Sequence, residues 1–208
     1  VYTGTVGSGV SVTAVTSTVD KYLLQDLVSA TSTLGAATTT ASYADKLQTL
    51  LGSTTGSDSG GTSLANSLAD LETALTELSG TPESETLQAS TVAALDTLAS
   101  QLRETSDGIQ GLRADADDSI EDSVSTINDS LNAIAALNSQ IATAQGRGES
   151  TADLEDQRNT ALQSLSEQMD VRYYVTSENQ MRITTTSGTT LLDSSVHELS
   201  YSSAATVT

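Results

Sequence analysis

The chain contains no cysteine, phenylalanine or tryptophan, and it has a single proline. The absence of cysteine excludes disulfides, thiolate catalysis and thiolate metal sites. Aromatic residues make up only 3 % of the chain, so large aromatic side chains cannot fill a thick core. The apolar residues that remain are Leu, Ile, Val and Ala, which suit narrow seams between helices. The composition therefore favours a helical rod over a compact globule.

Positive charge is also scarce. Eight Lys and Arg stand against 27 Asp and Glu, which gives a net charge of −19 and an isoelectric point near 4.1. Such a surface repels nucleic-acid phosphates and anionic lipid headgroups, so we expect neither nucleic acid nor membrane as a partner. No apolar run is long enough to span a bilayer, and no signal peptide is visible. The chain opens without Met and closes in a strand-like stretch, so we expect an internal fragment.

The first half of the chain predicts two helices. Residues 1–18, rich in Gly, Thr and Val, predict an extended arm or short strand, and Ser17 to Asp20 fits a helix-capping pattern. A helix that ends at Gly52 should follow, and five leucines predict a second helix that ends at Gly80. Both carry apolar residues at alternating spacings of four and three, the pattern of a packed helix face: Leu23, Leu27, Ala30, Leu34, Ala37, Ala41 and Ala44, then Leu64, Leu68, Leu71, Leu75 and Leu78.

One very long helix is predicted next. Thr81 and Pro82 suit its N-cap and first residue, and no strong breaker follows until Gly146. At ~1.5 Å per residue such a helix would be about 90 Å long. Two consecutive steps of four, from Ala116 through Ile120 to Val124, form a stutter in its predicted seam. The seam consists of Leu95, Leu98, Leu102, Thr105, Ile109, Leu112, Ala116, Ile120, Val124, Ile127, Leu131, Ile134 and Ile141.

Residues 153–175, DLEDQRNTALQSLSEQMDVRYYV, begin as a helix and end as a strand. Two further strands, joined by S-E-N-Q and S-G turns, complete a small antiparallel sheet. The predicted fold class is mainly α with a small β part: an elongated antiparallel helical bundle with one very long helix, capped by a small antiparallel β-sheet. We place the rod domain at 19–170, the sheet at 171–193 and the start of a truncated outer β unit at 194–208.

No nucleotide-binding, zinc-protease or serine-hydrolase motif is present. The only histidine, His197, has no second His or Cys to complete a site, so a surface loop position is favoured. The run from Asp115 to Asp122 is strongly acidic, but helices give poor geometry for a calcium site, so a solvated face is favoured. We therefore expect no enzymatic activity, no cofactor and no metal.

Arg158 shares a helical stripe with Leu154, Ala161, Leu165 and Met169. A charge on a core-facing stripe is costly unless it is paired. In one interpretation, the side chain reaches out to Glu155 or to solvent. In the other, its guanidinium donates to a carboxylate on a neighbouring helix.

The residues of three stretches resemble the flagellar hook-associated protein 1 family. Residues 153–171, centred on Asp156, Gln157 and Arg158, resemble its helix-to-strand signature. Residues 7–27 resemble its Gly-Val arm and first rod helix, and residues 137–148, LNSQIATAQGRG, resemble its long-helix end and turn. The resemblance implies that this fragment lacks the family's N-terminal and C-terminal core helices. We mark Arg158, Asp156, Gln157 and Pro82 as structural residues.

The resemblance implies a secreted, non-enzymatic junction protein of the extracellular bacterial flagellum, exported unfolded by the type III route. Its implied partners are hook protein, the second hook–filament junction protein (hook-associated protein 3), copies of itself and, in the full-length protein, an export chaperone. This fragment is expected to be a monomer. Two alternatives remain: a ligand-binding helical sensor domain of a bacterial receptor, and a surface adhesin stalk that trimerises along its heptads.

Overall fold

The computed structural model describes residues 20–52 and 63–204. It contains four helices and three strands in these ranges: α1 (Lys21–Leu51), α2 (Leu64–Gly80), α3 (Glu85–Gly146), α4 (Ala152–Gln168), β1 (Val171–Val175), β2 (Met181–Thr185) and β3 (Thr190–Leu192). The predicted class, mainly helical with one very long helix and a small antiparallel sheet, is confirmed. The arm predicted at 1–18 lies outside the described residues.

The chain divides into two compact units. Unit 1 combines residues 1–36 with 123–200, and unit 2 combines residues 37–122 with 201–208. Helices α1 and α3 each contribute residues to both units, so the division does not follow the order of segments along the chain.

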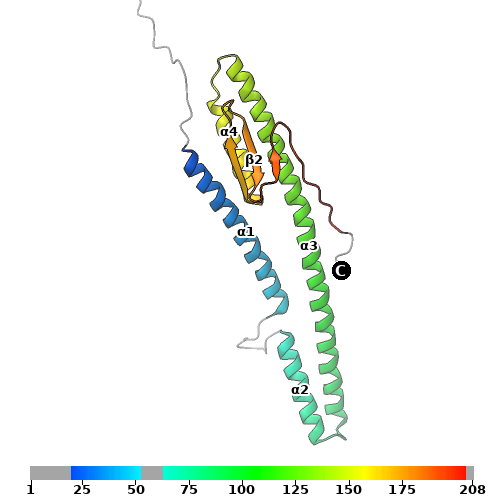
Figure 1. Cartoon of the computed structure of the whole chain (residues 1–208). Helices are drawn as coiled ribbons and strands as arrows, with labels where there is room; N and C mark the ends of the chain where they lie inside the picture. The colour runs from blue at the N-terminus through cyan, green and yellow to red at the C-terminus, as the bar shows by residue number, and fades with distance from the viewer. Residues whose placement is uncertain (1–19, 53–62, 205–208) are drawn as a thin grey trace, which may run out of the picture. The chain divides into compact units, whose positions relative to one another are not determined.

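Unit 1 holds the hydrophobic core. In Figure 1, α4 and the sheet lie beside the C-terminal part of α3. The sheet has the order β1-β2-β3, and both pairs are antiparallel, with Tyr173 opposite Ile183. The S-E-N-Q and S-G turns form as predicted, with Asn179 and Gly188 at positive φ. The core takes apolar side chains from every element of the unit: Leu24, Val28, Ile127, Leu131, Ile134, Leu162, Leu165, Val171, Met181, Ile183, Leu191 and Leu192.

The N-cap residue and the buried side of α1 differ from the prediction. The carboxylate of Asp20 caps the helix, because its Oδ1 accepts the N–H groups of Tyr22 at 2.9 Å and Leu23 at 3.4 Å. The predicted capping residue, Ser17, lies outside the described residues. The predicted seam through Leu23 and Leu34 is wrong in this helix, since these side chains are 68 % and 66 % exposed.

The buried stripe of α1 instead runs through Leu24, Val28 and Gly35. Gly35 explains why this side of α1 is the buried one. A Cβ atom at Gly35 would lie 2.4 Å from the carbonyl oxygen of Glu167, so only glycine lets α1 approach the backbone of α4 this closely. The sequence offers apolar residues on two adjacent stripes, and this close approach selects the stripe that contains the glycine.

Unit 2 has a thinner interior. Among its described residues, no apolar side chain is classed as buried. The seam between α2 and α3 contains polar contacts: the Thr91 hydroxyl donates to the Ala74 carbonyl at 3.2 Å, and Ser67 bonds Gln101. From α1, the Tyr43 hydroxyl lies 3.1 Å from that of Ser119.

The N-terminal half of α3 is rotated relative to the prediction. Leu98 and Thr105 are half-buried as expected, but Leu95 and Leu102 are 55 % and 49 % exposed. The contacts of α2 to Thr91 and Gln101 place the seam on the neighbouring stripe, which is rich in small and polar residues. Farther along α3, in unit 1, Ile127, Leu131, Ile134 and Ile141 are buried as predicted.

Pro82 does not begin the long helix. Thr81 is the C-cap of α2, and the N–H of Ser84 donates to the Thr81 carbonyl at 3.1 Å, which closes a turn with Pro82 at its second position. The helix then begins at Glu85. Ser84 caps this helix, because its hydroxyl accepts the N–H of Leu87 at 3.4 Å. The four residues between the two helices, 81–84, form this turn, and proline stands at the position where its fixed φ favours it.

Gly35→Ala tests the close approach of α1 to α4. The added methyl group must displace a backbone carbonyl, so we expect the free energy of unfolding to fall by about 1–3 kcal/mol, despite the higher helix propensity of alanine. Gly111→Ala is the matched control, because nothing lies within 4 Å of its Cβ position. That variant should be unchanged or more stable in urea unfolding. Equal stability of the two variants would contradict the close approach.

Candidate structural site around Arg158

The side chain of Arg158 is buried in unit 1, with 3 % of its surface exposed. Its Nη1 donates to Asn138 Oδ1 at 3.0 Å and to the carbonyl oxygen of Asn179 at 2.6 Å, while its Nη2 donates to Asn179 Oδ1 at 3.1 Å. The guanidinium therefore joins α4 to α3 and to the turn between β1 and β2. We name Arg158, Asn138, Asn179 and Glu155 the arginine cluster.

Both sequence interpretations of Arg158 need correction. The side chain does not reach solvent, and the acceptors that bind its guanidinium are amide and carbonyl oxygens rather than carboxylate oxygens. A carboxylate is linked to Arg158 only through Asn179. The Asn179 Nδ2 donates to Glu155 Oε1 at 2.7 Å, and the same oxygen accepts a hydrogen bond from the Thr151 hydroxyl. Negative charge thus stands near the cation without a direct ion pair.

The two asparagines also hold the backbone of the hairpin. Asn138 Nδ2 donates to the Met181 carbonyl at 2.8 Å, and Asn138 Oδ1 accepts the Met181 N–H at 3.0 Å. The side chain therefore pairs with β2 as a neighbouring strand would. Asn179 has φ 57°, a conformation that asparagine tolerates better than most residues, and its N–H closes the turn on the Thr176 carbonyl.

Burial lowers the pKa of Arg158, and the nearby Glu155 carboxylate opposes this shift. Arginine nevertheless stays charged over the accessible pH range. Its Nε is buried and has no acceptor among the described residues, so part of the desolvation cost stays uncompensated. The arrangement suits a fixed cationic link between elements.

The structure does not bring together the four residues marked from the sequence. Asp156 and Gln157 are exposed on α4, and Pro82 lies in a turn of unit 2. Asn138 and Asn179 are not among the residues predicted from the sequence. One signal was available, since Asn138 occupies a seam position between Ile134 and Ile141, where a polar residue needs a buried partner.

Other candidate groups lie outside the arginine cluster. His197 Nε2 is 3.3 Å from Asp193 Oδ1 on the surface, and both side chains are substantially exposed. Within the described part of the chain, no group of three or more metal-ligating side chains is assembled. No helix in that part is both long and apolar enough to cross a bilayer.

Arg158→Ala should lower the free energy of unfolding by about 1–3 kcal/mol, because it removes three buried hydrogen bonds to the oxygens of Asn138 and Asn179. The exposed neighbour variant Gln157→Ala should stay within about 0.5 kcal/mol of the parent. Urea unfolding followed by circular dichroism measures both. Hydrogen exchange of the Met181 amide should also accelerate in Arg158→Ala, and unchanged exchange there would contradict the link.

Comparison with known proteins adds independent evidence. The model of the flagellar hook-associated protein FlgK helical domain matches residues 44–207. A search of curated proteins finds no match. Among solved structures, the flagellar hook junction protein FlgK from Burkholderia pseudomallei matches with a TM-score of 0.72 and 24 % sequence identity.

That structural match covers 84 % of this chain and 30 % of the Burkholderia chain, so this chain spans less than a third of that protein. At this identity the likeness shows the fold. The family model covers most of the chain, and it agrees with the resemblance found in the sequence. The chain belongs to the family of the flagellar hook-associated protein FlgK helical domain.

Proposed function

We propose that this chain is the helical part of a protein that joins the flagellar hook to the filament by protein–protein packing, without catalysis. The proposed partners are hook protein, the second junction protein (hook-associated protein 3) and copies of the chain itself, with an export chaperone for the full-length protein. The proposed location is extracellular, after unfolded export through the type III apparatus. Membership of the FlgK family supports this proposal.

The observation that carries the packing role is a set of exposed apolar side chains in unit 2. They recur at spacings of seven residues, which places those on each helix along one stripe. Each is at least 37 % exposed: Leu68 and Leu75 on α2, and Leu95, Leu102 and Ile109 on α3. Scattered exposed leucines need no explanation, but regularly spaced ones match the pattern by which helices bury each other.

Two hollows in the described part of unit 2 give little support to the sensor-domain alternative. One, of about 470 Å³, is lined by α2 residues alone, including Leu68, Leu71 and Leu75. Another, of about 620 Å³, is lined by α1 residues alone. A small-molecule site normally surrounds its ligand with residues from several elements. Shallow hollows along single helices fit a packing partner better than an enclosed ligand.

Leu95→Ser with Leu102→Ser, introduced in the full-length protein, tests the packing surface. Because both side chains are about half exposed, the isolated fragment should keep its fold and lose about 1 kcal/mol or less per site. In cells that lack the native protein, the number of attached filaments should fall severalfold. The control carries Ala93→Ser and Glu104→Ser, two exposed changes on the opposite side of α3. Normal filament attachment in the leucine variant would contradict a role for this stripe.

The oligomeric state separates the junction proposal from the adhesin stalk. We expect the 208-residue chain to sediment as a monomer of 21.4 kDa at physiological salt, since a net charge of −19 opposes self-association. Sedimentation equilibrium at micromolar concentration measures the mass. A stable parallel trimer would favour the stalk.

A further inference from the structure

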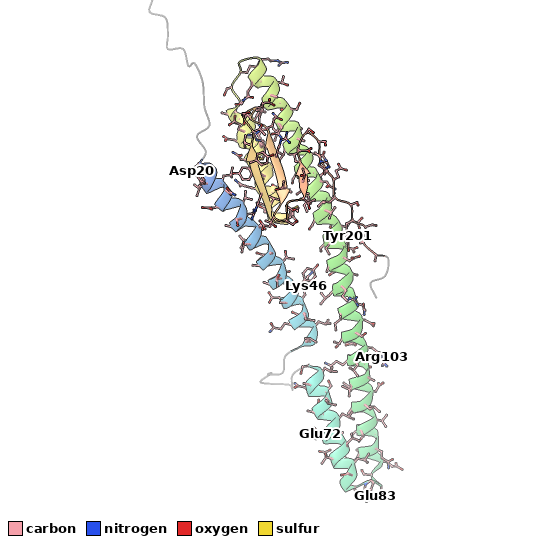
Figure 2. The ribbon with its side chains drawn as sticks, viewed as in Figure 1. Asp20, Lys46, Glu72, Glu83, Arg103 and Tyr201 are labelled. Carbon is pink, nitrogen blue, oxygen red and sulfur yellow. The ribbon has the colours of Figure 1, made fainter. Side chains whose placement is uncertain are left out.

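The acidic stretch of α3 contacts the segment formed by residues 201–204 in unit 2. Asp117 accepts hydrogen bonds from the Tyr201 hydroxyl and the Ala204 N–H through its two oxygens. One turn later, Glu121 Oε2 accepts the Ser203 N–H at 3.1 Å and the Ser203 hydroxyl at 2.7 Å. Figure 2 shows Tyr201 beside α3. Four donors of a short, uncharged segment thus converge on two carboxylates.

We propose that Asp117 and Glu121 form a strap site, which holds residues 201–204 on one face of α3 at neutral pH and releases them in acid. The sequence predicts a solvated face for this acidic run. In the structure, two of its residues, Asp117 and Glu121, bind residues 201–204 instead. The proposal stands on these hydrogen bonds and does not depend on the flagellar role.

The spacing explains why these two carboxylates act together. Residues four apart lie on one face of a helix, so Asp117 and Glu121 present their oxygens to the same segment. Hydrogen bonds to an ionised acceptor are stronger than neutral ones, and each carboxylate here accepts two. A segment with its own negative charge would be repelled, whereas Tyr201, Ser202, Ser203 and Ala204 provide donors and no charge.

The charged groups near the strap site are further acids of α3 and two cations, one of which pairs with another carboxylate. On α3, Asp115, Asp118 and Asp122 are further acids, and Arg113 is the nearby cation in the sequence. From α1, Lys46 Nζ approaches Asp115 Oδ2 at 3.7 Å and lies over the Tyr43 ring. Lys46 is therefore directed to Asp115, two residues before Asp117, and not to the strap contacts.

The direction of pH dependence follows from the hydrogen bonds. The Tyr201 hydroxyl, followed by the Ala204 N–H, lowers the pKa of Asp117, and the Ser203 hydroxyl and N–H lower the pKa of Glu121. A carboxylate whose pKa is lowered in the folded state stabilises that state above its ordinary pKa. The contribution is lost as the pH falls through the lowered value. The hydrogen bond to Asp117 also raises the pKa of Tyr201, so the phenol stays a donor at neutral pH.

Unit 1 provides an internal control. There, Asn128 holds Leu199 by two hydrogen bonds of 2.9 Å, one to the Leu199 carbonyl and one from its N–H. The Asn128 side chain is an amide and does not titrate. The Leu199 amide is therefore expected to stay fixed while the strap contacts titrate.

Asp117→Asn with Glu121→Gln tests the strap in the whole 208-residue chain, since it removes both charges and keeps the side-chain size. At pH 7 the Ser203 and Ala204 amides should exchange with deuterium about tenfold faster than in the parent. The control, Asp107→Asn with Asp118→Asn, makes the same change in net charge at two exposed positions of α3. It should leave both rates within about twofold. Unchanged exchange in the strap variant, or equal acceleration in the control, would overturn the proposal.

A titration of the parent protein gives a second test that needs no variant. In amide NMR spectra, the Ser203 and Ala204 proton resonances should shift with midpoints below the ordinary values of about 3.9 for Asp and 4.3 for Glu. The Leu199 resonance should shift little over the same range. Midpoints at or above the ordinary values, or a shift of all three amides together, would refute acid release from these carboxylates.

Discussion

The buried guanidinium of Arg158 sets the conditions that the rest of unit 1 satisfies. A cation removed from water needs acceptors in fixed positions, and here they come from α3 and from the β1–β2 turn. Asn138 can serve only if α3 runs beside β2, and Asn179 can serve only in its left-handed conformation. One side chain of α4 thereby fixes the position of the hairpin on the helices. The apolar core of unit 1 draws its side chains from the same helices and strands.

The two units use different means of holding helices together. Unit 1 buries leucine, isoleucine and valine side chains from every element and adds the arginine cluster. The helix seams of unit 2 are half-buried and depend on small residues and hydroxyl contacts such as Thr91 to Ala74. Burial of apolar area is the main source of stability, so the described part of unit 2 gains less from its own interior. Several of its larger apolar side chains, such as Leu68, Leu95 and Leu102, stand at the surface instead.

Sequence periodicity predicted which segments are helical but not always which side of each helix is buried. In the C-terminal half of α3, one apolar stripe dominates and is buried as predicted. Helix α2 forms as predicted, but Leu68 and Leu75 of its predicted seam are exposed. In α1, the stripe through Leu23 competes with the one through Leu24, and the backbone contact of Glu167 with Gly35 decides between them. A pattern along one helix carries no information about such an approach. For the same reason, Arg158 could be singled out from its stripe, whereas its partners Asn138 and Asn179 come from distant segments.

Part of the seam predicted to be buried in α3 is exposed in the structure. Leu95, Leu102 and Ile109 have the spacing of a buried face, yet each is substantially exposed in this chain. Exposed apolar area lowers solubility and is costly to keep without a use, whereas burial by a neighbour turns it into binding free energy. Periodicity therefore reports the contacts for which a helix is suited, including contacts that a single chain does not make. Such a face explains how a sequence can predict a seam that its own fold leaves open.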